Sequence, residues 1–316
     1  MSKSYPEISV IMSVNENLKD YMQLSIESIL NQSFKNFEFI IVNDGNNKFI
    51  SEIIDKYLEK DKRIIYKYTN GIGLTASLNY AISFSKTNYI ARQDYDDLSY
   101  TDRLKVQYNF LKNNNDYVFC ASNVNYINYL GNVKKNRFSQ NIFNIPHKKI
   151  KKILEYKNIF THSSCMFKKN IFNECGQYDE NFFYTQDYDL WTRMIQYGKF
   201  IKLKNKLLSL RIHAKSISFK KNKEQRFYSF LIGLKYLYPE ILDYTKNIND
   251  YNFIDTIEKK FKNNNKIINV IKARKYVFLF DEVKIVNFFS YSLSVQYKII
   301  ILYFKKPAYL IYRLFK

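Results

Sequence analysis

The sequence predicts an α/β protein with a mostly parallel, Rossmann-like sheet and flanking helices. Apolar runs that suit buried strands alternate with segments of helical spacing as far as about residue 123. Several of these runs end in polar residues, and ligands of such sheets bind beyond the carboxyl ends of the strands. From about residue 220 the pattern is helical and rich in Lys and Arg, which predicts a helical, basic C-terminal extension.

The expected elements alternate as a parallel sheet requires. Residues 8–14 are a continuous apolar run, typical of a strand buried on both faces. The other expected strands are 37–42, 64–66, 89–91 and 117–121, and the expected helices are 18–30, 49–58, 74–85 and 101–112. A hairpin at 124–133, helices at 146–156 and 187–197, and a strand at 162–167 follow. We assign residues 1–218 to one domain and residues 219–316 to the extension.

Three acids within four residues, Asp94, Asp96 and Asp97, follow the expected strand 89–91. Carboxylates this close repel one another unless a cation lies among them. Mg²⁺ and Mn²⁺ prefer oxygen ligands, and Mg²⁺ is typically held by one or two carboxylates plus substrate phosphates. The cluster, expected to face solvent at a strand end, therefore predicts a site for a divalent metal and a diphosphate. A solvated acidic turn is the alternative interpretation.

Other motifs surround this cluster in a fixed order along residues 5–218. They are Ile8–Glu16 (ISVIMSVNE), Ser25–Phe34 (SIESILNQSF), Phe37–Gly45 (FEFIIVNDG), Asn70–Asn79 (NGIGLTASLN), Gln186–Arg193 (QDYDLWTR) and Arg211–His213 (RIH). Together with the acids they resemble the nucleotide-sugar glycosyltransferases of GT-A fold, in particular the inverting family 2 enzymes. The resemblance implies metal-dependent transfer of a sugar from a UDP-sugar to a hydroxyl group.

The resemblance also implies residues that bind the donor. Asp44 would accept a hydrogen bond from the uracil ring, although an Asp-Gly pair is also a common turn. Asp96 would bind the ribose or the metal, Asp97 the metal, and Asp94 the sugar or ribose. Arg92 would contact a phosphate or form an ion pair with one of the acids. The remaining expected donor contacts are Val14, Asn15, Glu16 and Asn79, and His213 would return to the metal or diphosphate.

Asp187 is the candidate general base, because inverting transfer needs a carboxylate that deprotonates the acceptor hydroxyl. Members of the family usually carry Glu-Asp here, and this chain has Gln186-Asp187, so the base is kept and a neighbouring charge is lost. Asp189 is an alternative base, and a helix N-cap is an alternative role for Asp187. His162 and Gln186 are expected near the acceptor and sugar pocket, with a packed strand residue as the alternative for His162.

Charge and cysteine content bear on partners and compartment. The net charge of +21 is distributed as +4 over residues 1–197 and +17 over residues 198–316. Such a field favours a polyanion: anionic lipid, nucleic acid or an acidic substrate. Three cysteines outside any Cys-x-x-Cys pair, no signal peptide and no run of 18 apolar residues lead us to expect the cytoplasm. Residues 297–316 are expected to bind an anionic inner-membrane surface, or else to pack on the catalytic domain.

The expected function is that of a hexosyl- or N-acetylhexosaminyltransferase that builds a surface glycan: capsule, lipooligosaccharide or a lipid-linked intermediate. It would lie at the inner face of the plasma membrane. A basic, aromatic-rich nucleic-acid binder is one alternative, but the aromatic residues fall within apolar runs rather than among basic ones, so no nucleic-acid partner is expected. A sugar-nucleotide pyrophosphorylase is another, but its Gly-rich basic loop after the first strand is replaced by VNEN at 14–17.

Overall fold

The computed structural model divides the chain into two compact units, and each is described by itself. Unit 1 comprises residues 1–154 and 158–221, and unit 2 comprises residues 155–157 and 222–316. The structure describes residues 5–15, 19–45, 47–134, 143–155, 157–182, 184–214, 216, 221–237, 259 and 263. The segment 297–316 and the candidate donor contact Glu16 therefore lie outside the described residues.

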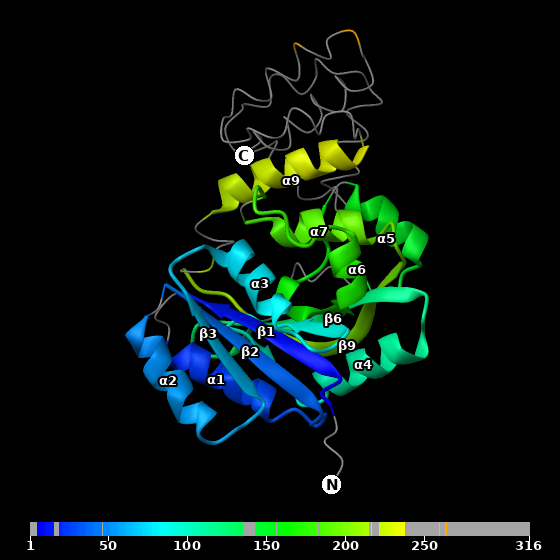
Figure 1. Cartoon of the computed structure of the whole chain (residues 1–316). Coiled ribbons are helices and arrows are strands. Elements are labelled where there is room, and N and C mark those ends of the chain that lie inside the picture. The colour runs from blue at the N-terminus through cyan, green and yellow to red at the C-terminus, as the bar shows by residue number, and fades with distance from the viewer. Residues whose placement is uncertain are drawn as a thin grey trace. The chain divides into compact units, whose positions relative to one another are not determined.

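Unit 1 is built on one sheet of strand order β3–β2–β1–β4–β8–β6–β9–β5, with β7 paired to β6 (Figure 1). The strands are β1 (Ile8–Val14), β2 (Phe37–Asp44), β3 (Ile64–Thr69), β4 (Tyr89–Arg92), β5 (Leu98–Ser99), β6 (Tyr117–Ile127), β7 (Val133–Lys134), β8 (Cys165–Lys168) and β9 (Lys199–Arg211). Strands β3, β2, β1 and β4 are parallel to one another, as are β6 and β9, while β8 runs antiparallel between β4 and β6. The mostly parallel sheet expected from the sequence is thus confirmed.

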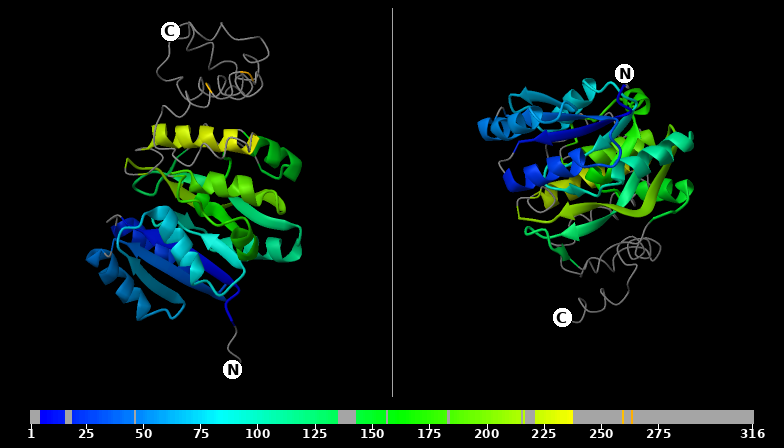
Figure 2. Two further views of the ribbon diagram at one scale, coloured as in Figure 1. Left: turned by 45° about the horizontal axis from the view of Figure 1, so that its top comes forward. Right: turned by 90° about the horizontal axis from the view of Figure 1, so that it is seen from below.

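Helices cover both faces of the parallel part of the sheet. The helices of unit 1 are α1 (Lys19–Leu30), α2 (Lys48–Leu58), α3 (Leu74–Ser83), α4 (Arg103–Asn113), α5 (His147–Leu154), α6 (Lys169–Glu174) and α7 (Gln186–Met194). Helices α1, α2 and α4 share one hydrophobic core with alternate residues of β1 and β2, and α3 lies on the opposite face (Figures 1 and 2). All seven residues of β1 are buried for this reason.

Helix α2 shows how local sequence specifies an element. Its N-cap, Asn47, accepts a hydrogen bond from the backbone N–H of Phe49 at 3.0 Å, which satisfies one of the free donors of the first turn. Ile50, Ile53 and Ile54 follow at helical spacing and are buried against the sheet. Each buried isoleucine contributes about 1.5–3 kcal/mol, so this one face fixes the helix on the sheet.

The part of the sheet after β4 differs from the expectation at β5, which was not expected, at β9 and at the start of β8. Strand β9, the longest of the described strands, was not expected, because its lysines interrupt the apolar pattern. One of them, Lys202, is buried and donates from Nζ to the carbonyl oxygen of Ile159 at 2.9 Å. The strand expected at 162–167 begins only at Cys165, because His162–Ser164 form a 3₁₀ turn. The expected hairpin is present, with β7 paired to the end of β6.

Unit 2 contributes one described helix, α9 (Asn222–Leu237). Most of the remaining extension, for which the sequence predicts further helices, lies outside the described residues. Among the residues that the structure does describe, no helix combines the length and the apolar character needed to cross a membrane.

Candidate functional site

The carboxyl ends of β1, β2 and β4 lie at one edge of the sheet and carry most of the expected donor contacts. The three strands are parallel neighbours, with Val14 opposite Asn43 and Ile11 opposite Arg92. Val14 is buried at the end of β1, and Asn15 after it is exposed. Asp44 ends β2, and the acidic cluster follows β4. The sheet therefore brings these sequence-distant residues to the edge where ligands of such sheets bind.

Asp44 shapes the loop between β3 and α3. Its carboxylate accepts hydrogen bonds from the Thr69 hydroxyl and from the backbone N–H groups of Ile72 and Gly73, at 2.8, 2.8 and 2.9 Å. Gly73 has a φ of 87°, a conformation that L side chains rarely adopt. The carboxylate is nearly buried, so its contacts within the described residues are structural ones that fix this loop beside the strand ends.

Arg92 forms the ion pair that was one of its two expected roles. Its guanidinium pairs with the Asp94 carboxylate and also donates to the carbonyl oxygen of Ile11 at 3.3 Å. The Arg92 side chain is 2% exposed. Burial raises the pKa of Asp94, the Arg92 charge lowers it, and the neighbouring Asp96 raises it again. Arg92 thus offsets part of the repulsion within the cluster.

Asp97 does not face solvent as expected, since it is only 1% exposed. One carboxylate oxygen accepts the hydroxyl of Ser163, and the other accepts the backbone N–H of Arg211 at 2.8 Å. Burial and the charges of Asp96 and Asp94 raise its pKa well above the ordinary range. These contacts make Asp97 a junction between β4, the turn before β8 and the end of β9.

Asp96 and His213 meet at this junction. His213 Nε2 lies 2.8 Å from Asp96 Oδ2, and both side chains are largely buried. Arg211 supports the pair, because its Nε donates to the carbonyl oxygen of Asp96 at 2.9 Å and its guanidinium lies over the ring of Tyr21. The Tyr21 ring also packs against His213, with centroids 5.4 Å apart. The Arg-x-His motif therefore returns to the acidic cluster.

The possible metal ligands at this point are compatible with a divalent cation. Within the described residues no three His, Cys, Asp or Glu side chains converge as a complete metal site. Asp96 and His213 offer one carboxylate and one imidazole side by side. A cation bound through one or two side chains and completed by substrate phosphates needs no more than this. The residues present thus fit a metal that arrives with a diphosphate.

Asp187 lies in the first turn of α7 and is held at both oxygens. Oδ1 accepts the backbone N–H of Tyr188, and Oδ2 accepts Nδ2 of Asn158, each at 2.8 Å. Burial raises the pKa of Asp187 to about 6, these two hydrogen bonds oppose the rise, and the charge of Asp94 adds to it. The N-cap of α7 is Thr185, so the N-cap role considered for Asp187 is wrong. A half-buried carboxyl with this pKa has the properties of a general base at neutral pH.

Asp189, the alternative base, is fully buried in an ion pair. Arg193 donates to its Oδ2 from Nε at 2.9 Å and from Nη2 at 2.7 Å. The same guanidinium donates to the carbonyl oxygens of Cys175 and Gln177. Asp189 therefore connects α7 to the turn after α6 and has no exposed oxygen for a substrate.

Three candidates remain, and each has different contacts: His162, Asn79 and Gln186. Nε2 of His162 lies 2.7 Å from the hydroxyl of Tyr178, and burial lowers the pKa of His162 well below its ordinary range, so the ring is neutral. Asn79 bonds both the N–H and the C=O of Tyr178, at 3.1 and 2.9 Å. Gln186 opens α7, and its buried Oε1 accepts no hydrogen bond from the described residues.

Sequence reasoning missed three side chains that organise the site: Asn158, Ser163 and Tyr178. Asn158 lies in an irregular segment, and Tyr178 follows a turn, so no periodic pattern marks either. Ser163 lies in the expected strand 162–167, but its partner Asp97 is 66 residues away in the chain. Only the fold, in which β8 lies between β4 and β6, brings these residues to the strand ends.

Comparison with known proteins agrees with this geometry. Residues 9–176 match the family described as glycosyl transferase family 2. An uncharacterised glycosyltransferase of Methanocaldococcus jannaschii is 38% identical over 228 residues, which are 71% of this chain and 77% of the relative. The O-antigen biosynthesis glycosyltransferase WbnJ of Escherichia coli is 40% identical over 218 residues, 66% of this chain and 81% of WbnJ.

Solved structures share the fold at low sequence identity. TarS 1–349 of S. aureus, in complex with UDP-GlcNAc, has a TM-score of 0.61 at 14% identity, covering 89% of this chain and 77% of TarS 1–349. The mannosyltransferase PcManGT from Pyrobaculum calidifontis, in complex with GDP-Man and Mn²⁺, has a TM-score of 0.57 at 13% identity, covering 96% and 82%. The fold is therefore GT-A, and on the family match and the two sequence relatives the chain belongs to glycosyl transferase family 2.

Proposed function

We propose that the enzyme transfers a hexose or N-acetylhexosamine from a UDP-sugar to a hydroxyl of a growing surface glycan, with inversion. One observation supports the proposal: burial raises the pKa of Asp187 to about 6, and the charge of Asp94 in the acidic cluster adds to the rise. A base on α7 would then act near the strand ends where the donor would bind. The name of WbnJ, an O-antigen enzyme, and the UDP-GlcNAc in the TarS structure support the glycan and the donor class.

In this proposal the acidic cluster and His213 would hold the donor diphosphate through a divalent cation. Asp96 and His213 would bind a divalent cation, Mn²⁺ or Mg²⁺, which when bound offsets the negative charge of the leaving diphosphate. Asp97, proposed from the sequence as a metal ligand, would act through the contacts that hold Ser163 and Arg211 in place. Asp94, fixed by Arg92, would orient the sugar or ribose. Asp44 and Asn15 would lie on the side of the site that binds the nucleotide.

Asp187 would take the proton of the acceptor hydroxyl as that oxygen attacks the anomeric carbon. The bond from the anomeric carbon to the diphosphate oxygen breaks in line, on the opposite face of the sugar. With a pKa of about 6, Asp187 is mostly ionised at neutral pH and still basic enough to accept a proton. Gln186, next to this base at the start of α7, would lie near the acceptor and sugar pocket.

The acceptor would be presented at an anionic inner-membrane surface. Unit 1 has features that suit this: the hairpin between β6 and β7 exposes Tyr129, Leu130 and Val133, each by 60% or more. Residues 117–154, which include this hairpin and α5, contain seven basic side chains and no acid. An exposed aromatic and aliphatic tip that shares its hairpin with the exposed Lys134 favours a lipid interface. Sedimentation with anionic but not neutral vesicles, weakened by Leu130→Asp, is the expected result.

Thermal unfolding in the presence of nucleotide sugars tests the donor and the metal together. A UDP-sugar at 100-fold its Kd should stabilise the protein by about 2.7 kcal/mol, and only when Mn²⁺ or Mg²⁺ is present. GDP-, CMP- and dTDP-sugars are the comparison. His213→Ala should reduce the metal-dependent part. Equal stabilisation by a UDP-sugar with EDTA and with Mn²⁺ would disprove the metal role.

Membership of the family replaces the pyrophosphorylase interpretation. The absence of a nucleic-acid partner stays a prediction.

A further inference from the structure

The side chain that holds the Asp187 carboxylate comes from outside the sequence motifs. Asn158 lies 29 residues before Asp187, and its Nδ2 donates to Asp187 Oδ2 at 2.8 Å. We propose that Asn158 is a positioning residue: it fixes the rotation of the Asp187 carboxylate and favours its ionised form. The inference rests on the proposed function, because it takes Asp187 as the base.

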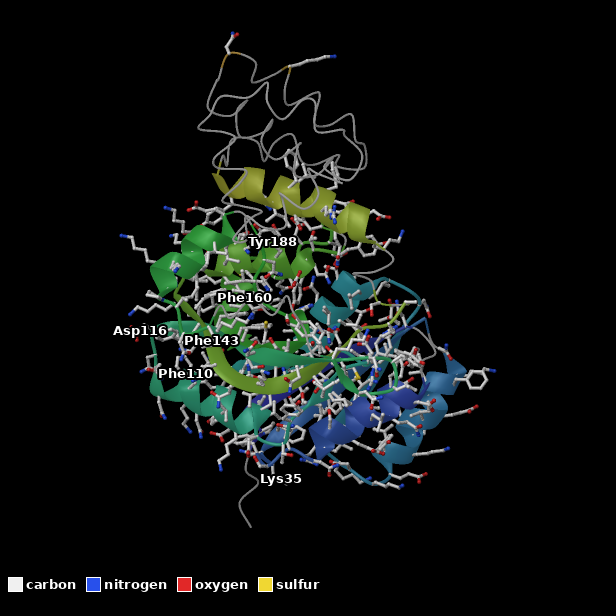
Figure 3. All side chains as sticks on the ribbon, turned by 180° about the vertical axis from the view of Figure 1, so that it is seen from behind. Lys35, Phe110, Asp116, Phe143, Phe160 and Tyr188 are labelled. Carbon is white, nitrogen blue, oxygen red and sulfur yellow. The ribbon has the colours of Figure 1, made fainter. Side chains whose placement is uncertain are left out.

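The orientation of the Asn158 amide follows from its second contact. The backbone N–H of Phe160 donates to Asn158 Oδ1 at 3.0 Å. An amide turned by 180° would place its NH₂ group against this N–H donor and its oxygen against the Asp187 carboxylate, so two hydrogen bonds would be lost. Nδ2 must therefore face Asp187. Figure 3 shows Phe160, two residues after Asn158, in the same part of unit 1 as Tyr188 of α7.

Each oxygen of Asp187 thus accepts one hydrogen bond, and each can accept another. The backbone N–H of Tyr188 fixes Oδ1, and Asn158 fixes Oδ2. An ionised carboxylate has about four acceptor positions, so at least two remain for an acceptor hydroxyl. With only the contact to Tyr188, the carboxylate would have more freedom to turn about its Cβ–Cγ bond. Asn158 removes that freedom, and a base must lie within hydrogen-bond distance of the proton that it takes.

A neutral donor suits this position better than a cation. Burial and Asp94 both raise the pKa of Asp187, while Asn158 and the Tyr188 N–H lower it. The buried side chains Cys165 and Tyr178 also interact with Asp187, and burial raises both of their pKa values, so both are neutral at pH 7. A Lys or Arg in place of Asn158 would lower the pKa of Asp187 by a further one to three, about the shift that an adjacent cation causes, and so weaken the base.

Carboxyl titration of the whole chain by ¹³C NMR tests the role without a substrate. In protein labelled at the Asp carboxyl carbon, the resonance lost in Asp187→Asn identifies Asp187. The wild-type midpoint should lie near pH 6. In Asn158→Ala it should rise by about one pH unit or more, because a hydrogen bond to a charged group has been removed. Asn158→Asp, which keeps an oxygen for Phe160, should raise it further by charge repulsion.

Asn88 provides the matched control. Its Oδ1 also accepts one backbone N–H, that of Asn170 at 3.0 Å, but it precedes β4, at the opposite end of that strand from the acidic cluster. Asn88→Ala should leave the Asp187 midpoint unchanged. An unchanged midpoint in both Asn158 variants would overturn the inference, even if Asp187→Asn stops turnover. If Asp187→Asn releases UDP from a UDP-sugar at the wild-type rate, the base assignment itself fails, whatever the titration shows.

Discussion

The free energy of unfolding of Asp187→Asn should increase relative to that of the wild type as the pH rises. The raised pKa of Asp187 means that the folded protein binds this proton more tightly than the unfolded chain does. The ionised form is therefore disfavoured by folding, and wild-type stability falls as the pH rises from the ordinary value of 3.8 through about 6. Asparagine does not titrate, so the variant lacks this loss.

The magnitude follows from the two pKa values. A difference of about 2 corresponds to about 3 kcal/mol, at 1.36 kcal/mol for each pKa unit, and half-burial reduces it to about 2–3 kcal/mol. The local cost of replacing a carboxyl by an amide, including the contact with Asn158, is the same at every pH. It therefore cancels when the difference in the free energy of unfolding at about pH 4 is subtracted from that at about pH 8.

Urea unfolding monitored by tryptophan fluorescence measures this quantity. Trp191 is the single tryptophan of the chain, is fully buried on α7 and lies four residues after Asp187, so its emission reports on unit 1. The pKa values of Asp94 and Asp97 are also raised, but both groups titrate in the variant and in the wild type. Their contributions to the stability difference therefore largely cancel. A stability difference between Asp187→Asn and the wild type that is constant from about pH 4 to about pH 8 would refute the raised pKa.

Two further predictions concern packing in unit 1. A Cβ at Gly198 would lie 2.4 Å from Val118 Cγ1 and 3.2 Å from the carbonyl oxygen of Asp116, so Gly198→Ala should destabilise unit 1 by about 1–3 kcal/mol in urea unfolding. Adding Val118→Ala should recover part of that loss, and additive costs would contradict the steric explanation. Asp189→Asn should cost about 3 kcal/mol by leaving Arg193 without its charge partner, with UDP release per folded molecule retained. Lost release in folded Asp189→Asn protein would show a direct role in catalysis.

The elements that sequence predicts correctly are those with a local pattern. Strands β1 and β2 are mostly apolar and buried along their whole length, and α2 has its cap and its three buried isoleucines within eight residues. Strand β9 has no such pattern, because its stability comes from pairing with β6, more than 80 residues earlier. A buried lysine such as Lys202 is acceptable there only because a carbonyl oxygen distant in the sequence accepts a hydrogen bond from it.

The residues of the site also fall into two groups, those that a local motif indicates and those whose role depends on the fold. The motifs indicate which residues meet at the strand ends, and His213 does reach Asp96. They do not indicate how deeply each side chain is buried, so the sequence did not distinguish exposed ligands from internal junctions such as Asp97 and Asp189. Asn158 was missed because its role depends entirely on a contact made across the fold.

UDP release by Asp187→Asn tests the central claim most directly. The wild type and the variant would be compared at pH 8 with the UDP-sugar that gives the largest metal-dependent thermal shift. Asp187→Asn should bind this donor with nearly wild-type affinity and turn it over about 10²–10⁴-fold more slowly, because only the proton acceptor has been removed. Wild-type turnover, or a loss confined to donor affinity, would contradict the assignment of Asp187 as the base.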